Sequence, residues 1–144
     1  MGKKKVVQKL GDTKVEEKVK VQEVVGISKK IETGKVFINA SYNNTVITVT
    51  DSVGNVLAWS SAGALGFSGP KKATPFAASK IVAALSEKMK KSGPFNLDIV
   101  VKGVGSGRDS AVRTFAAQGF NILSIKDATP VPHNGPRPPK TRRV

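Results

Sequence analysis

The sequence predicts one α/β domain with the element order βββαβαβ, and three observations support this class. Three β-rich segments follow one another between residues 35 and 60. A helix with a continuous apolar stripe comes next. Two more strands then alternate with a second helix, which is the pattern of an α/β sheet. At 144 residues, the chain is long enough for one such core with tails.

The three β-rich segments predict an antiparallel meander. Residues 35–41, 45–51 and 56–60 are rich in β-branched or aromatic residues. Asparagines in residues 42–44 and a glycine in residues 52–55 supply the two turns. Because both connections are short, consecutive strands are expected to pair with each other.

Residues 61–74 form a long connection with few acids. Glycine recurs at every third position, at Gly63, Gly66 and Gly69, and Lys71 and Lys72 stand near the end. Connections of this length in a compact domain are usually functional or mobile.

The first helix begins at Pro75. Thr74 is its expected cap, because a threonine hydroxyl accepts a backbone N–H and proline suits the first helical position. Gly93 and Pro94 end the helix. Apolar residues at the helical spacing predict one buried stripe: Ala78, Ile81, Val82, Leu85 and Met89.

The second half of the core contains two strands and one helix. Residues 96–102 predict a strand, and a glycine turn leads from it into a helix over about 108–118. Gly119 ends the helix, and residues 120–126 predict the last strand. The helix residues expected to face inward are Val112, Phe115 and Ala116.

Two segments flank the core, which we assign to residues 35–127. Residues 1–34 have nine lysines, five acids (9 − 5 = +4) and no aromatic residue, so a flexible charged leader is expected. The valines of this leader could also join a helix or strand on a partner.

Residues 128–144 hold five of the eight prolines, and every charged residue there is a cation. Proline excludes regular helix and central strand, so this tail is expected to be stiff, extended and suited to a polyanion.

Charge and composition limit the possible functions. The net charge of +14 points to an anionic partner, either nucleic acid or an anionic membrane surface. Absence of cysteine and a single histidine exclude disulfides, thiolate metal sites and histidine clusters, so no cofactor is expected. The longest strictly apolar run, residues 81–85, is too short to span a membrane. Because no secretory signal is recognisable, a cytoplasmic protein is expected.

The glycine turn has the sequence Gly103-x-Gly105-x-Gly107-Arg108 between a strand and a helix. Glycines let backbone amides approach an anion, and a helix N-terminus carries partial positive charge. The spacing differs from the dinucleotide fingerprint G-x-G-x-x-G, and no P-loop motif is present. Three interpretations remain open: contact with the phosphates of a long polyanion, a plain tight turn, or a soluble nucleotide site.

Carboxylates near strand or helix ends could indicate a metal-dependent nuclease. In so basic a chain, isolated acids more often cap helices or pair with lysines. The sole histidine, His133, lies in the proline-rich tail, where no catalytic triad is credible. We therefore expect no catalytic residue and no enzymatic activity. The carboxylates are Asp51, Asp98, Asp109 and Asp127.

The aromatic residues are few, and we expect most of them to face the core. They are not expected to form the paired stacking platform of an RNA-recognition sheet. The composition therefore favours recognition of RNA backbone and shape over the reading of single-stranded bases. The aromatic residues are Phe37, Tyr42, Trp59, Phe67, Phe76, Phe95, Phe115 and Phe120.

Several short motifs occur in one order from about residue 35 to residue 144. They are Asn43-Asn44-Thr45, Trp59 with Ser61-Ala62-Gly63, Gly66-Phe67, Thr74-Pro75-Phe76-Ala77-Ala78, Val101-Lys102-Gly103, Gly107-Arg108, Thr129-Pro130, Pro132-His133-Asn134-Gly135 and Arg137-Pro138-Pro139-Lys140. Each motif alone is weak, but the ordered set closely resembles the family of bacterial-type small-subunit ribosomal protein eleven (universal ribosomal protein eleven).

This resemblance implies a ribonuclease-H-like mixed sheet without nuclease activity. It implies a structural constituent on the platform of the small ribosomal subunit, bridging helices of small-subunit ribosomal RNA near the messenger exit path and the Shine–Dalgarno cleft. Ribosomal proteins seven and eighteen would be neighbours, with messenger RNA nearby. No membrane and no small-molecule substrate are implied.

RNA contacts are expected in four regions: the turn after the first strand, the lysines of the long connection, the glycine turn with the second helix, and the tail. The residues are Asn43, Asn44, Lys71, Lys72, Gly103, Gly105, Gly107, Arg108, Arg113, His133, Asn134, Arg137, Lys140, Arg142 and Arg143.

Two rival functions remain open. An enzyme acting on phosphate esters through the glycine turn would be stabilised by a metal or a nucleotide. A general nucleic-acid or chromosome-compacting protein would bind duplex DNA as well as ribosomal RNA.

Overall fold

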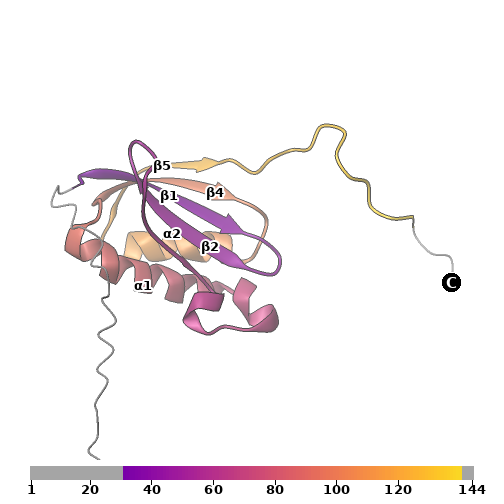
Figure 1. Ribbon diagram of the computed structural model, residues 1–144, viewed down its shortest axis with the longest axis horizontal. Helices are drawn as coiled ribbons and strands as arrows, with labels where there is room; N and C mark the ends of the chain where they lie inside the picture. Colours follow the sequence, from indigo (N-terminus) through magenta and orange to yellow (C-terminus); the bar gives the residue numbers. More distant parts are fainter. Residues whose placement is uncertain (1–30, 141–144) are drawn as a thin grey trace, which may run out of the picture.

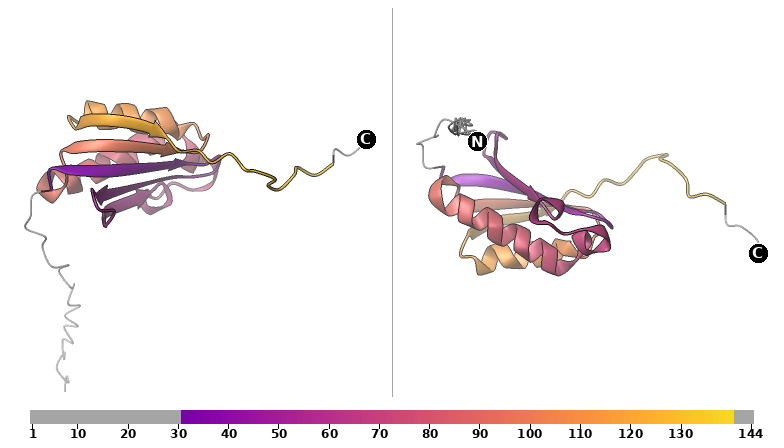
Figure 2. Two further views of the ribbon diagram at one scale, coloured as in Figure 1. Left: turned by 90° about the horizontal axis from the view of Figure 1, so that it is seen from above. Right: turned by 60° about the horizontal axis from the view of Figure 1, so that its bottom comes forward.

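A mixed sheet of five strands carries two helices on one of its faces (Figures 1 and 2). The computed structural model describes residues 31–140. The elements are β1 (Thr33–Ala40), β2 (Thr45–Asp51), β3 (Val56–Ser61), α1 (Pro75–Ser92), β4 (Asn96–Lys102), α2 (Gly107–Ala117) and β5 (Asn121–Asp127). The predicted order βββαβαβ is confirmed. Of the leader predicted for residues 1–34, residues 1–30 lie outside the described part of the chain.

The strands lie in the order β3-β2-β1-β4-β5. The meander of β1, β2 and β3 is antiparallel, as short turns require. In contrast, β4 pairs in parallel with β1, and β5 pairs in parallel with β4, because each follows a helical crossover. As a result, the C-terminal ends of β1, β4 and β5 all lie at the same end of the sheet.

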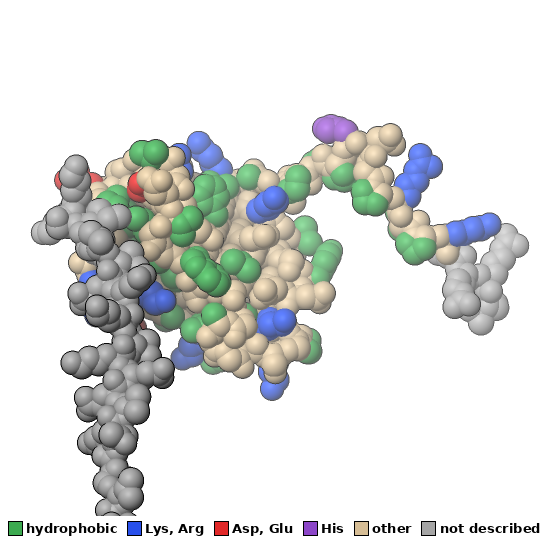
Figure 3. Space-filling model, viewed as in Figure 1, with side chains coloured by type: hydrophobic (Ala, Val, Ile, Leu, Met, Phe, Trp, Pro, Cys, Tyr) green, Lys and Arg blue, Asp and Glu red, His purple; other side chains and the backbone are tan. Residues whose placement is uncertain are grey.

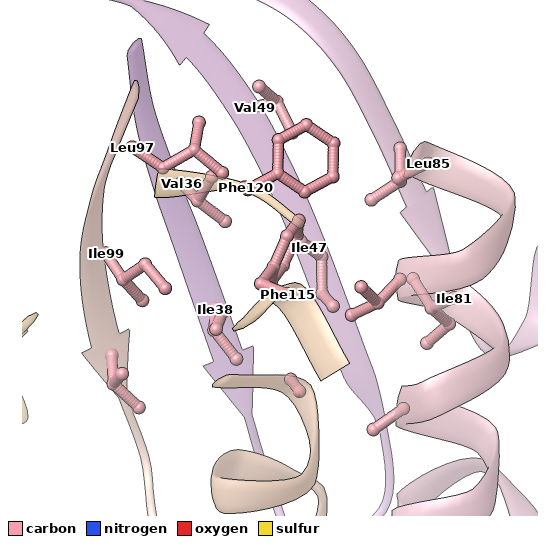
Figure 4. Close-up of a cluster of buried hydrophobic side chains, with 14 of the residues drawn as sticks. Val36, Ile38, Ile47, Val49, Ile81, Leu85, Leu97, Ile99, Phe115 and Phe120 are labelled. Atoms are coloured by element: carbon pink, nitrogen blue, oxygen red, sulfur yellow. The ribbon is translucent and has the colours of Figure 1, made fainter. Parts of the chain in front are cut away.

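One face of the sheet and the two helices enclose the core. Because side chains alternate between the two faces along β1, Val36 and Ile38 point toward the helices, and both are fully buried. Figure 4 shows how these side chains meet residues from β2, β4, α1 and α2. The labelled residues are Val36, Ile38, Ile47, Val49, Ile81, Leu85, Leu97, Ile99, Phe115 and Phe120. This packed layer is a rigid support for the loops at the strand ends.

The first helix has the predicted bounds and the predicted buried stripe. The hydroxyl of Thr74 accepts a hydrogen bond from the Ala77 amide at 3.3 Å, which satisfies one of the free N–H groups of the first turn. Ala78, Ile81, Val82, Leu85 and Met89 are all buried. Among the helices within residues 31–140, none has both the length and the apolar character needed to cross a membrane.

The second helix is rotated slightly from its predicted orientation. Phe115 is buried and Val112 packs against the core, as expected, but Ala116 is exposed and its prediction was wrong. The buried positions are Gly107, Ala111 and Phe115, which recur every four residues and therefore share one face. Ala116 lies about 100° around the helix from Phe115.

Hydroxyl groups join the two helices where they approach closely. Ser79 Oγ lies 2.8 Å from Ser110 Oγ, and the Thr114 hydroxyl donates to Ser79 Oγ at 3.2 Å. Nearby, Ser106 Oγ donates to the Ala73 carbonyl at 2.7 Å. These contacts hold the start of α2 beside the start of α1.

The long connection of residues 61–74 has local helical structure. It contains two 3-10 helices, η1 (Gly63–Leu65) and η2 (Gly69–Ala73). Gly66 and Gly69 have positive φ values of 85° and 57°, where glycine is favoured because it has no Cβ. Gly66 and Gly69 therefore serve the turns of this connection.

The prediction that most aromatic residues face the core was wrong. Only Phe115 and Phe120 are buried. Because the helices cover one face of the sheet, odd positions of β1 and β3 point to the other face, where Phe37 is 40% and Trp59 is 60% exposed. Other aromatic side chains that are largely exposed are Tyr42, Phe76 and Phe95.

Candidate nucleic-acid interface

Three predicted RNA-contact segments meet at one end of the sheet, where β1, β4 and β5 finish. The Gly105 amide donates to the Ala40 carbonyl at 2.8 Å, which joins the glycine turn to the end of β1. The Ala128 amide donates to the Val101 carbonyl at 2.8 Å, which joins the start of the tail to β4. We call residues 41–44, 103–107 and 128–129 together the tail end of the sheet.

The turn after β1 is held by its own polar groups. Ser41 Oγ accepts from the Asn44 amide at 3.0 Å, and the Asn44 side-chain oxygen accepts from the Thr45 amide at 2.9 Å. Asn44 therefore helps to hold the turn, whereas Tyr42 and Asn43 are exposed. Of the two predicted asparagines, Asn43 is the more accessible.

The glycine turn packs closely against the end of β1. A Cβ on Gly103, which has φ of 97°, would lie 2.2 Å from the Ala40 carbonyl oxygen. A Cβ on Gly105 would lie 2.3 Å from the Ser41 carbonyl oxygen. Steric contact alone therefore requires glycine at both positions.

Two amides of this turn are already used within the protein. The Gly103 amide donates to Thr129 Oγ1 at 3.2 Å, and the Gly105 amide donates to the Ala40 carbonyl. Gly107 is buried, and a Cβ there would lie 2.7 Å from Thr45 Oγ1. This geometry favours the tight turn and disfavours a cradle for a soluble nucleotide.

Arg108 binds the place where the tail begins. Its guanidinium donates to the Gly103 carbonyl at 3.1 Å and to Asp127 Oδ2 at 2.7 Å. Asp127 Oδ1 accepts from the Thr129 amide at 3.0 Å and from its hydroxyl at 2.6 Å. We call Gly103, Arg108, Asp127 and Thr129 the tail-root cluster.

The tail-root cluster favours the ionised form of Asp127. The hydrogen bond from the Thr129 hydroxyl, followed by that from Arg108, lowers the pKa of Asp127 from 3.8 to about 2. Part of the charge of Arg108 is therefore balanced inside the protein. The Arg108 side chain is still 32% exposed, so it remains partly accessible to a further anion.

Beyond the cluster, the tail leaves the body as an extended chain (Figures 1 and 2). Residues 130–140 have no helix or strand and are all exposed. Figure 3 shows basic side chains and the single histidine spaced along this segment. They include His133, Arg137 and Lys140, with the exposed amide of Asn134 between them. The predicted contacts Arg142 and Arg143 lie outside the described residues.

The remaining predicted contacts lie near the starts of the two helices. Lys71 is exposed and Lys72 half-buried on η2, which Ser106 links to the start of α2. Arg113 is exposed farther along α2. The structure brings the lysines toward the tail end of the sheet, whereas Arg113 lies along a side of the body.

The carboxylates do not converge. Asp51 accepts from the amides of Gly54 and Asn55 in its own hairpin, and the Asn55 side chain is the main cause of its lowered pKa. Asp98 accepts from Ser124 Oγ at 2.6 Å, and Asp127 belongs to the tail-root cluster. In the part of the chain that the structure describes, no three His, Cys, Asp or Glu residues are grouped so that they could hold a metal ion.

Sequence reasoning missed the roles of Asp127 and Thr129. Their spacing, an aspartate two residues before a threonine, is typical of a local side-chain turn and could have indicated a fixed tail root. Nothing in the sequence pairs Asp127 with Arg108, which is 19 residues earlier.

A basic α/β body with an exposed cationic tail has the features of a structural protein that binds nucleic acid through phosphates. The sequence model of one family, described as ribosomal protein S11, matches residues 34–143. The chain belongs to the ribosomal protein S11 family, and the resemblance found in the sequence is confirmed.

Membership defines the general role of the chain. It is a structural component of the small ribosomal subunit that binds ribosomal RNA and assembles with other ribosomal proteins. The family is a structural class and not a class of enzymes.

Proposed function

We propose that this chain lies on the platform of the small subunit and bridges helices of its ribosomal RNA near the messenger exit path and the Shine–Dalgarno cleft. Ribosomal proteins seven and eighteen would be its neighbours, and messenger RNA would pass nearby. The family assignment supports this placement on cytoplasmic ribosomes. In this role the chain needs no cofactor, small-molecule substrate or catalytic residue.

The observation that carries the proposal is the continuity between the tail end of the sheet and the tail. Asn43 is exposed in the turn after β1, and the glycine turn is hydrogen-bonded to the end of that strand. The tail-root cluster then connects the glycine turn to the exposed cations beyond it. An RNA strand lying against the end of the sheet could therefore continue along Arg137 and Lys140. Such contacts carry charge and shape recognition and little base sequence.

The tail-root cluster gives the tail a defined starting direction. Ordering an extended chain on RNA loses roughly 1–2 kcal/mol of conformational free energy per residue, and charge-assisted hydrogen bonds to phosphates offset that loss. Because the root at Thr129 is already hydrogen-bonded, the residues nearest the body have less freedom to lose.

We also propose that the fold is of the ribonuclease-H-like class. The strand order β3-β2-β1-β4-β5, antiparallel through the meander and parallel beyond β1, supports this finer assignment. Superposition on ribonuclease H domains tests it.

Deletion of residues 129–144 tests the proposed function. The core should remain folded because residues 129–140 contribute no helix or strand, whereas incorporation into small subunits should fall strongly. Co-sedimentation with small subunits and the circular dichroism of the free chain measure the two properties. Normal incorporation of the truncated chain would refute the role of the tail.

A matched control removes positive charge from the C-terminal end of α1, away from the tail end of the sheet. Lys88, Lys90 and Lys91 lie in its last turns, far along the helix from η2 and the start of α2. Substituting all three with glutamine should leave incorporation nearly unchanged. Equal losses in both variants would indicate that only the total charge matters.

A further inference from the structure

The sheet face turned away from the helices carries two exposed aromatic rings. Strand registers place five residues in one row across the sheet: Trp59, Thr48, Phe37, Val100 and Lys126. The buried neighbours Val36 and Ile38 point to the helices, so Phe37 points away from them. No helix within residues 31–140 covers this side (Figures 1 and 2), which we call the open face.

The two rings are spaced so that each can accept a separate flat ligand. Phe37 and Trp59 lie two strands apart, which is about 9–10 Å at the usual strand spacing. The small side chain of Thr48 stands between them. Among the described residues, neither ring packs against another aromatic ring.

The charges of the open face suit an anionic partner. Lys35, Lys102 and Lys126 alternate with core-facing residues on β1, β4 and β5, and therefore belong to this face. Its carboxylate, Asp98, lies in register with Lys35 and accepts a hydrogen bond from Ser124. The face therefore has more cations than anions around its aromatic row.

The open face is also continuous with the tail end of the sheet. Lys102 directly precedes Gly103, and Lys126 directly precedes Asp127 of the tail-root cluster. A polyanion bound at the tail end of the sheet could therefore extend over the aromatic row of the open face and remain in contact with lysines along its path.

We propose that the open face binds unpaired bases of RNA, with Phe37 and Trp59 each stacking on a base. Lys35, Lys102 and Lys126 meet the phosphates that connect those bases. Every base has a π-face, so this site tolerates different sequences. The inference rests on the proposed function in that RNA is the ligand, but it assigns a second site, which stacks on unpaired bases.

Trp59 is the only tryptophan of the chain, so its fluorescence reports directly on the open face. We would titrate the full chain with a short oligoadenylate strand and with an RNA duplex of equal length, following binding by the anisotropy of labelled RNA. The single strand should quench Trp59 and shield it from acrylamide. The duplex should bind through phosphates and leave the tryptophan signal unchanged.

Phe37→Leu supplies an independent test. Loss of one stacked base should weaken single-strand binding about 5- to 150-fold, with duplex binding unchanged. Retained duplex binding and the native Trp59 emission show that the variant is folded. The control Phe95→Leu alters another exposed ring, beside the start of β4, and should change neither affinity.

Several results would overturn the stacking site. These are an unquenched Trp59 in the saturated single-strand complex, equal quenching by the duplex, or an unchanged affinity of Phe37→Leu. If Trp59 stayed accessible to acrylamide on ribosomal RNA but became shielded in complete subunits, a protein would be the occupant. In all these cases, retained binding to small-subunit ribosomal RNA would leave the proposed function standing, whereas loss of that binding would refute both.

Discussion

Gly103 illustrates how one residue shapes the end of the sheet. Its φ of 97° is outside the range that other residues readily adopt, and a Cβ added there would collide with the carbonyl group of Ala40. Two separate effects therefore require glycine here, backbone conformation and steric contact. Gly119 has a similar φ of 86° but nothing within 4 Å of an added Cβ.

Comparing the two glycines separates these effects. Gly119→Ala should lower the free energy of unfolding by roughly 1–3 kcal/mol through backbone strain alone. Gly103→Ala should lower it by more, because the carbonyl of Ala40 must also move. Chemical denaturation measures both variants, and equal losses would show that the contact with Ala40 contributes nothing.

The ionisation of Asp127 gives a second prediction for a single residue. Its pKa in the folded chain is about 2, below the ordinary value of 3.8, so the ionised carboxylate stabilises the folded tail root above about pH 4. That contribution is lost as the pH falls from 3.8 through about 2. The NMR shift of the Thr129 amide in the full chain should follow this titration.

Variants identify the cause of the lowered pKa. Thr129→Val should raise the titration midpoint of Asp127 toward 3.8 more than Arg108→Ala does. The reason is that the threonine hydroxyl is the larger cause of the lowered pKa. A midpoint near 3.8 in the unaltered chain would mean that the tail-root cluster does not form in solution.

At the scale of elements, α1 was predictable because its signals are local. A cap, a proline, an apolar stripe and a terminating glycine all lie within the segment itself. The face of α2 was predicted less well, since Val112, Phe115 and Ala116 lie on adjacent parts of a short helix. Only its packing on the sheet selects Gly107 and Ala111 over Ala116.

The cap of α1 gives a prediction for that element. Thr74→Ala should lower the free energy of unfolding by about 1 kcal/mol, because the Ala77 amide loses its acceptor. Thr74→Ser keeps the hydroxyl and should lose much less. Thermal denaturation distinguishes the two, and similar losses for both variants would assign the effect to the threonine methyl group.

Long-range relations were not readable from the sequence. Alternation in β1 predicts two faces but does not say which is covered, so the expectation that most aromatic residues face the core did not foresee that Phe37 is exposed. Arg108 was expected to face phosphates, and only the fold shows that Asp127 lies beside it. Its proposed RNA contact therefore involves a guanidinium that is already partly paired.

At the scale of the whole molecule, the body and the tail have different tasks. The body packs one sheet against two helices and holds the turns at the tail end of the sheet. The tail adds cations without adding a core. After Asp127 these cations are Arg137, Lys140, Arg142 and Arg143.

The dependence of ribosomal RNA affinity on salt tests this division most directly. Each phosphate contact contributes a slope of about 0.7 to 0.9 in a plot of log affinity against log salt. Replacing the four tail cations with glutamine should therefore reduce the slope by about 3, whereas replacing Lys88, Lys90 and Lys91 should change it little. The same slope for the full chain and the tail variant would contradict the claim that the tail binds RNA through its cations.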